Sequence, residues 1–447
     1  MKLTLFALAS VTALVAGVAA QTRPAAKPLE IYVTDVEGGK NDLWVTPSGQ
    51  TVLIDTGSPG ARDVDRIMEV INAAGVKQID YLLLTHYHVD HVGGFQELVK
   101  RIPVMHFLDH GPTVEDGIDG RQREQVAGFQ AAYAEIYGKA KHTVLKPGDR
   151  IPVTGLDWRI VTSAAKVTKV PLPGGGKPNP ACAGATRAEI PRDPDNAQSV
   201  GSIVTFGGFR LLDFGDMTAD IEYDLMCPTN PIGSVDMYFA SNHGTNNANS
   251  KVLVHGVAPR VAVVQNNPGK GASVEMFQAL RTSSRLEDIW QLHWGNAAGA
   301  EWNSPGVFIA NGVEPAAIAA ALTAPPRGAG AGPGGGAAAG AAGAAGAAGA
   351  AGGRGAGGPA GTPGQAPQAA PAGPQVPAPA AAPQAQPAPA AAPAAAAGQG
   401  APATAGGRGG GQPPHTPAHW IKITVQPSGA FTVTNTRNNF SKTYPAN

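Results

Sequence analysis

Short apolar or alternating segments, separated by turn residues, recur along the chain and predict buried strands. The first of them are Leu29–Val33, Asp42–Val45, Thr51–Ile54 and the wholly apolar Tyr81–Leu84. The same pattern predicts later strands over Val104–Leu108, Trp158–Val161, Ile203–Phe206, Phe209–Leu212, Met237–Ala240 and Val261–Val264.

Apolar residues at helical spacing lie between these strands. The segment Ala61–Ala74 carries them at i, i+3, i+4 and i+7, on Val64, Ile67, Met68 and Ile71. A second helix is expected to begin at Phe95, and others are expected over Arg121–Tyr137, Thr218–Met226, Ser250–Val257 and Ser273–Thr282. Two successive passes of strands and helices predict an α/β (α+β) fold, either an αββα sandwich or a doubly wound sheet.

Composition changes this picture after residue 323. Residues 324–416 are almost wholly Ala, Gly, Pro and Gln, which offer too little apolar surface to offset the entropy of ordering, so we predict a long disordered insertion. Beyond it, residues 417–447 contain two alternating segments, Trp420–Val425 and Ala430–Asn435. They predict a β-hairpin, and because an isolated hairpin is only marginally stable, it should dock on the main domain, residues 28–323.

The N-terminus has the pattern of an export signal. Lys2 precedes the apolar run Leu3–Val18, and small residues come just before position 21. We expect residues 1–20 to be a cleaved signal peptide and the protein to be periplasmic or secreted, with no membrane span after cleavage. In an exported protein Cys182 and Cys227 could form a disulfide; two buried free thiols are the alternative.

Charge is unevenly distributed along the chain. The net charge is zero, but up to Glu314 there are 33 acidic against 27 basic residues, because the six basic residues beyond it have no acidic counterpart. The resulting net charge of −6 is opposite in sign to that expected of a nucleic-acid-binding domain. A nucleic-acid partner is therefore not favoured, and a small-molecule substrate is expected.

Four candidate ligands follow the Tyr81–Leu84 segment within six residues: His86, His88, Asp90 and His91. Three imidazoles and a carboxylate are costly to bury together unless a cation compensates them. The turn at the end of a strand lets one short loop direct ligands to two cations. The motif therefore predicts a metal site.

The spacing His-x-His-x-Asp-His resembles the hallmark of the metallo-β-lactamase fold superfamily. Asp55 after an apolar strand, Asp216 in a Gly-Asp pair and His243 in Asn-His-Gly also resemble motifs of that superfamily, in the same order. The resemblance implies an αββα sandwich in which Asp55 supports the site, Asp216 bridges two metals and His243 completes the second metal's ligands. The opening segment Asp35–Gly39 is most similar to the branch that contains the hydrolase domain of DNA-internalisation (competence) proteins.

The sequence departs from the family pattern at two places. Asn242 replaces the first residue of a His-His-Gly motif, where it would make a supporting contact. The third imidazole of the first metal, usually some twenty residues before the bridging Asp, is missing, and the segment Asp195–Ser199 stands there. Asn196, a water molecule or His110 could supply that ligand.

The resemblance implies one or two Zn²⁺ ions, and the nitrogen and oxygen ligand set also suits Mn or Fe. A metal-bound hydroxide would attack an electrophilic centre, with Asp90 as the catalytic residue that orients it. The expected activity is an exported metal-dependent hydrolase of a small phosphodiester or a lactone or ester. The alternatives are a β-lactam hydrolase and a non-catalytic binding protein on a degenerate metal site.

The loop Asn266–Gly271 either binds an anionic group through Lys270 or is merely a turn.

Overall fold

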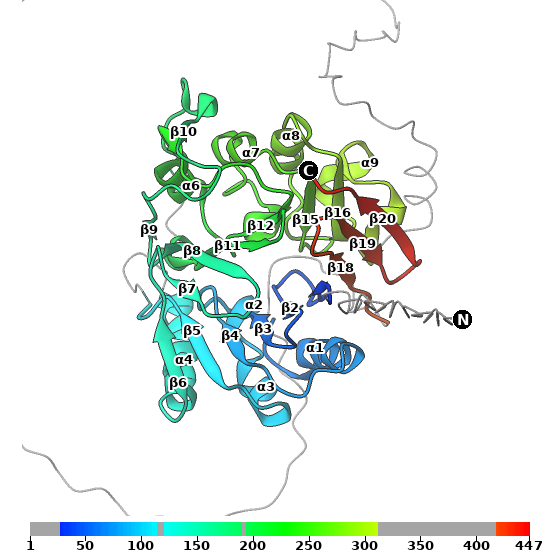
Figure 1. Ribbon diagram of the computed structural model, residues 1–447. Coiled ribbons are helices and arrows are strands. Elements are labelled where there is room, and N and C mark those ends of the chain that lie inside the picture. Colours follow the sequence, from blue (N-terminus) through cyan, green and yellow to red (C-terminus); the bar gives the residue numbers. More distant parts are fainter. Residues whose placement is uncertain (1–26, 114–119, 190–193, 312–416) are drawn as a thin grey trace, which may run out of the picture. The chain divides into compact units, whose positions relative to one another are not determined.

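The computed structural model describes residues 27–113, 120–189, 194–311 and 417–447, which all belong to one unit of the fold (Figure 1). The predicted signal peptide, residues 1–20, and the Ala/Gly/Pro-rich stretch, residues 324–416, lie outside the described residues. None of the helices in the described ranges has both the length and the apolar character that crossing a membrane requires.

The first sheet has nine strands in the order β20-β19-β18-β1-β2-β3-β4-β5-β6. Its strands are β1 (Leu29–Val33), β2 (Asp42–Val45), β3 (Thr51–Ile54), β4 (Tyr81–Leu83), β5 (His106–Asp109), β6 (Lys141–Val144), β18 (Ile421–Val425), β19 (Phe431–Asn435) and β20 (Phe440–Tyr444). Strands β3 to β6 run parallel, so the loops that leave β3 and β4 emerge at the same edge.

The second sheet follows the order β17-β16-β15-β14-β12-β11-β8-β7, with β9 (Lys166–Val167) paired to β8. Its other strands are β7 (Arg150–Ile151), β8 (Asp157–Ser163), β11 (Gly201–Phe206), β12 (Phe209–Asp213), β14 (Met237–Phe239), β15 (Val261–Val264), β16 (Asp288–His293) and β17 (Ile309–Asn311). Strands β12, β14, β15 and β16 are parallel. A separate two-stranded sheet joins β10 (Lys177–Pro178) to β13 (Thr229–Asn230).

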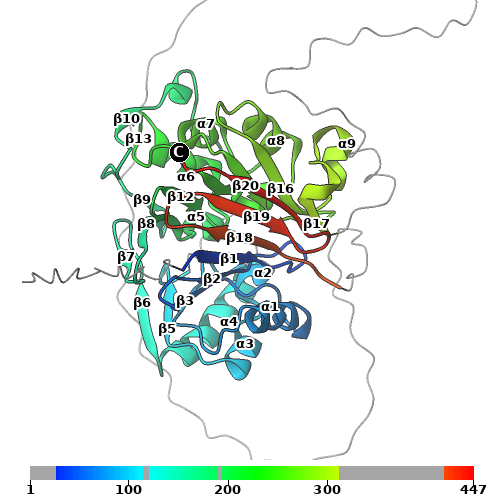
Figure 2. The ribbon, with the colours of Figure 1, turned by 45° about the vertical axis from the view of Figure 1, so that its right-hand side comes forward.

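Helices lie outside both sheets (Figures 1 and 2). Those associated with the first sheet are α1 (Ala61–Ala73), α3 (Phe95–Arg101) and α4 (Gly120–Tyr137), and those associated with the second are α6 (Ala219–Met226), α7 (Lys251–Val257) and α8 (Val274–Arg281). Shorter helices are α2 (Val89–Val92), α5 (Pro194–Gln198) and α9 (Gly299–Trp302). This layering confirms the predicted αββα metallo-β-lactamase sandwich.

The period of two along each strand produces this layering. In β1, Leu29, Ile31 and Val33 face the core between the sheets, whereas Tyr32 packs with the helices on the other side. Because both faces of each sheet are covered, the central strands are apolar on both sides. Polar side chains occupy the edge of the sandwich at which the parallel strands end.

The C-terminal strands complete the first sheet. Strand β18 pairs antiparallel with β1, with Leu29 opposite Val425, and the predicted hairpin is formed by β18 and β19. A third strand, β20, was not predicted; its Tyr444 is buried, and the hydroxyl of Tyr444 accepts a hydrogen bond from Trp290 Nε1 at 3.0 Å. In the second half of the fold a disulfide joins Cys182 and Cys227.

Candidate metal centre

The predicted ligands come from loops at the ends of three strands. His86 and His88 follow β4, and Asp90 and His91 lie on the adjoining helix α2. From the second sheet, Asp216 follows β12 and His243 lies in a 3-10 turn, Ser241–Gly244, just after β14. The two sheets face each other, so these loops meet. The structure brings together residues that are up to 157 positions apart in sequence.

Asp55 fixes the orientation of the His91 ring. It follows β3 in the left-handed backbone region, with φ of 56°. Its Oδ2 accepts hydrogen bonds from His91 Nδ1 at 2.8 Å and from the Thr85 hydroxyl at 2.7 Å, and its Oδ1 accepts one from the Thr85 backbone N–H. With Nδ1 engaged in this way, the Nε2 atom of His91 is directed toward the other candidate ligands.

His243 is oriented by the backbone. Its Nδ1 donates to the carbonyl oxygen of Gln265 at 3.0 Å, so its Nε2 is the ring nitrogen that faces the other candidate ligands. Nε2 lies 3.1 Å from Asp216 Oδ2 and 3.3 Å from His91 Nε2. Asp216 follows Gly215, whose φ of 56° and close approach to Thr85 leave no room for a Cβ atom. The loop that carries Asp216 is therefore held against the β4 loop.

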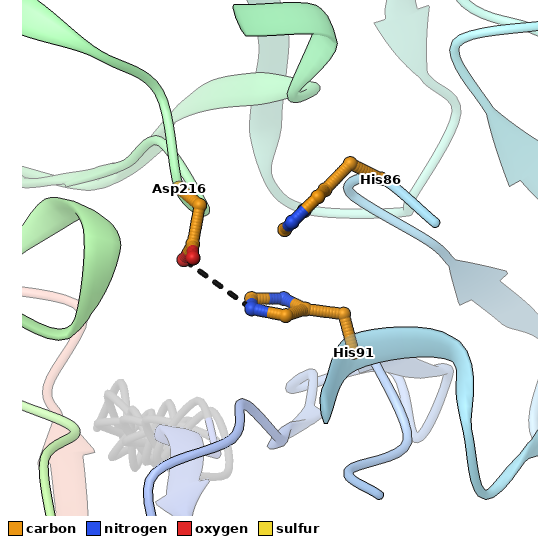
Figure 3. Close-up of side chains that lie close together, drawn as sticks. All are labelled: His86, His91 and Asp216. Carbon is orange, nitrogen blue, oxygen red and sulfur yellow. Dashed lines mark ion pairs between the residues drawn. The ribbon is translucent and has the colours of Figure 1, made fainter. Parts of the chain in front are cut away.

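His86 completes the cluster, as Figure 3 shows. Its Nδ1 contacts the Thr85 hydroxyl at 3.1 Å, and its buried Nε2 has no hydrogen-bond partner among the described residues. One ligand atom each from His86, His91 and Asp216 lie within 4.8 Å of one another, and so do one each from Asp90, His91 and His243. Three imidazole Nε2 atoms and carboxylate oxygens thus converge, which is the arrangement that a bound cation requires.

The charges of the cluster also suit a bound cation. Burial opposes a charge on His91, yet the carboxylates around it, Asp216 foremost, outweigh that effect and raise the pKa of His91 to about 10. Burial likewise opposes a charge on Asp216, but His243 and His91 hold its pKa well below the usual range. Burial and the neighbouring imidazoles lower the pKa of His86. With its pKa raised, the His91 ring keeps a second proton at neutral pH, and a metal ion bound to that ring would displace the proton.

Asp90 and Lys270 form the more exposed side of the cluster. The ammonium group of Lys270 lies 2.5 Å from Asp90 Oδ2 and also donates to the Gly38 carbonyl at 3.0 Å. The Lys270 side chain is 39% exposed and that of Asp90 is 19% exposed, whereas the His91 and Asp216 side chains are at most 5% exposed. The Lys270 side is therefore more open to solvent than the side formed by His91 and Asp216. From the sequence alone, Lys270 could be either an anion-binding residue or part of a simple turn.

The other predicted site residues have different surroundings. The Asn242 side chain donates to the Asp216 carbonyl oxygen at 3.2 Å, so it contacts the loop that carries the ligand. Within the described ranges, His110 belongs to none of the groups that could hold a metal ion. It packs edge-on against the Tyr87 ring, and its Nε2 lies 3.9 Å from an oxygen of Asp195. Asn196 lies on α5 next to Asp195.

Asp195 itself groups with His86 and His88. This arrangement was not predicted, although Asp195 stands in the segment where the third imidazole is missing.

Comparison with known proteins gives matches to this part of the chain. Residues 36–176 match the metallo-beta-lactamase superfamily, a range that includes the His86–His91 motif and ends before Asp216. The competence protein ComA of Neisseria gonorrhoeae is 26% identical over 246 residues, which are 55% of this chain and 28% of that protein. A beta-lactamase-like protein 2 homolog of Caenorhabditis elegans is 26% identical over 108 residues, which are 20% of this chain and 36% of that protein.

Among solved structures, Igni18, a metallo hydrolase from the archaeon Ignicoccus hospitalis, shares 14% identity with this chain. The match covers 58% of this chain and 94% of Igni18, with a TM-score of 0.33. The chain spans only about a third of the length of the two curated relatives that it matches.

Proposed function

Because this chain is a metallo-β-lactamase superfamily protein related to the competence branch, we propose that it is an exported metal-dependent hydrolase that acts on a small phosphodiester, lactone or ester. The observation that carries the proposal is the convergence of the His91 and His243 Nε2 atoms on Asp216, within 3.3 Å. Buried imidazole nitrogens and carboxylate oxygens that lie this close together are the ligand arrangement that a divalent cation requires.

The residues fit one or two divalent cations. His86, His88 and Asp216 would hold the first, and Asp90, His91, Asp216 and His243 would hold the second. All supply nitrogen or oxygen, a set that suits Zn²⁺ and also Mn²⁺ or Fe²⁺. When bound, such a cation polarises a carbonyl or phosphoryl oxygen and lowers the pKa of a water molecule toward neutrality.

Asp90 would orient the attacking water. Burial opposes its ionisation, but Lys270, His91 and His243 hold its pKa well below the usual range, so the carboxylate is ionised at neutral pH. An ionised carboxylate on the exposed side of the cluster accepts a hydrogen bond from water and fixes the direction of the water's lone pair. With so low a pKa, Asp90 acts by positioning and is a weak proton acceptor.

Lys270 would bind the negative charge of the substrate. Its ammonium group contacts Asp90, and its side chain is more exposed than those of Asp90, His91, Asp216 and His243. A cation held by Asp90 and His243 would compete with Lys270 for Asp90, leaving the ammonium group available for a substrate oxygen. This arrangement favours an anionic substrate, a phosphodiester in particular.

The test is a substrate panel with the metal-loaded protein and two lysine variants. Bis(p-nitrophenyl) phosphate is the anionic substrate, p-nitrophenyl acetate the neutral ester, and a chromogenic lactone and a chromogenic β-lactam complete the panel. A charge-assisted hydrogen bond contributes roughly 1.5 to 3 kcal/mol, so Lys270→Met should raise KM for the phosphodiester about 10- to 100-fold. KM for the neutral ester should hardly change.

The matched control is Lys251→Met, since Lys251 is an exposed lysine on α7. An unchanged KM for the phosphodiester in Lys270→Met would contradict the anionic substrate. If the metal-loaded protein turned over no member of the panel, the hydrolase proposal would fail and the binding-protein alternative would gain support.

A further inference from the structure

Asp195 is a buried carboxylate beside the candidate metal centre. It lies on α5, and its side chain is fully buried. Its Oδ2 accepts a hydrogen bond from the Tyr87 backbone N–H at 2.7 Å, and its Oδ1 accepts one from the Thr113 hydroxyl at 2.9 Å. Both donors are neutral, and no lysine or arginine of the described ranges forms an ion pair with it.

Two imidazoles lie next to this carboxylate. One ligand atom each from His86, His88 and Asp195 lie within 4.8 Å of one another. The local backbone keeps the three residues together, because Tyr87 stands between the two histidines in the sequence and its N–H donates to Asp195. The His86 and His88 rings meet edge to face with centroids 4.6 Å apart, and both histidines lie on the loop between β4 and α2, the helix that carries His91.

The energetics of burial point to a cation at this position. Removing an ionised carboxylate from water costs several kcal/mol unless a charge or several hydrogen bonds compensate it. Two neutral donors supply part of that compensation. A divalent cation held between Asp195, His86 and His88 would supply the rest, and it would also engage the His86 Nε2 atom, which has no hydrogen-bond partner in the described part of the chain.

We propose that Asp195 is a direct ligand of the first cation, together with His86 and His88, in place of the third imidazole that the sequence lacks. The inference rests on the proposed metal-dependent function and adds a residue to it. A carboxylate in place of an imidazole adds one negative charge to the first site and makes the ligand set richer in oxygen. Such a set shifts metal preference toward Mn²⁺ or Fe²⁺.

A purely structural role for Asp195 would have other consequences. In that case its task would be to hold the Tyr87 N–H and the Thr113 hydroxyl, and any residue that keeps those hydrogen bonds would serve. A ligand must instead donate an electron pair to the metal. Asp195→His restores such a donor without the carboxylate hydrogen bonds, and Thr113→Val removes a hydrogen bond while leaving the carboxylate in place.

The experiment measures metal per chain by elemental analysis after gel filtration, with circular dichroism as the folding check. It also records the visible absorption of the Co²⁺-substituted proteins, which depends on the ligands. We expect about two equivalents in the wild type and in Thr113→Val, about one in Asp195→Ala, and close to two again in Asp195→His. The Co²⁺ spectrum of Asp195→His should differ from that of the wild type, because a nitrogen replaces an oxygen.

The outcomes separate the two proposals. A wild type with two equivalents and a folded Asp195→Ala that also keeps two, with an unchanged Co²⁺ spectrum, would overturn the ligand role and leave the hydrolase proposal intact. A wild type that binds no metal would overturn both. If Asp195→Ala fails to fold, Asp195→Asn and Asp195→His decide: an Asp195→Asn with two equivalents and the wild-type spectrum would refute the inference.

Discussion

Replacing Lys40 with Met should strongly destabilise the fold, because Lys40 neutralises two buried carboxylates. It lies on the loop between β1 and β2, and its ammonium group is 2.6 Å from Asp42 Oδ2 and 3.0 Å from Asp213 Oδ2. The Lys40 side chain is 5% exposed, and the two carboxylates are at most 4% exposed. Met fills a similar volume without the charge, so both carboxylates would remain buried without their cation.

The expected loss in the free energy of unfolding follows from the burial of these ion pairs. Removing one partner of a buried ion pair costs about 3 to 5 kcal/mol. About 300 residues are described, and an unfolding entropy of roughly 2.1 cal/mol/K per residue converts that cost to a fall in Tm of about 5 to 8 °C. Urea denaturation followed by tryptophan fluorescence measures the free energy directly. The matched control is Lys442→Met, whose 40% exposed side chain pairs with Asp288, where a loss of at most about 1 kcal/mol is expected.

The same variant should show a pH dependence of known sign. Burial raises the pKa of Asp42 to about 6 from an ordinary value of 3.8, even with Lys40 beside it. Since the folded-state pKa is the higher one, the associated stability is present below about pH 4 and is lost as the pH rises through 6. Without Lys40 that folded-state pKa rises further, so the deficit of Lys40→Met should be larger at pH 8 than at pH 5. A deficit below 1 kcal/mol at pH 8 would refute this reasoning.

Two further predictions concern the disulfide and the support of His91. Thiol titration of the purified protein under denaturing, non-reducing conditions should find no free thiol, because Cys182 and Cys227 are bridged, and two free thiols would contradict the bridge. Asp55→Asn should weaken metal binding or activity about 10- to 100-fold, as is typical for residues that orient a ligand. Asp80→Asn, at the start of β4, is the control in the metal titration, and an equal loss in both variants would argue against the role of Asp55.

Much of the fold could be predicted because the strands that flank the centre are buried on both faces. Runs such as Val261–Val264 have no polar position, and the expected strand and the observed β15 coincide. The strands that were missed have weaker patterns. In β20 only Tyr444 is buried. In β16 the polar Gln291 interrupts the apolar pattern; it can be buried there because its side-chain amide donates hydrogen bonds to His293 and Asn303.

The candidate centre could be predicted only where its ligands are close in sequence or match a family motif. The His86–His91 loop could be recognised because four candidate ligands, three histidines and one aspartate, fall within six residues. Asp195 and Lys270 could not be placed in the same way, since their contacts are to Tyr87, 108 positions away, and to Asp90, 180 positions away. Those contacts depend on how the two sheets face each other, which the pattern of apolar and polar residues along the sequence does not specify.

Metal content of the wild type, Asp216→Ala and His243→Ala is the most direct test of the central claim, that Asp216 lies between two cations. The proteins would be compared after gel filtration, with circular dichroism to verify folding and with Asp224→Ala, an exposed carboxylate paired with Arg187, as the control. We predict about two equivalents for the wild type and the control, about one for His243→Ala and less than one for Asp216→Ala. A folded Asp216→Ala that retains two equivalents would contradict the account.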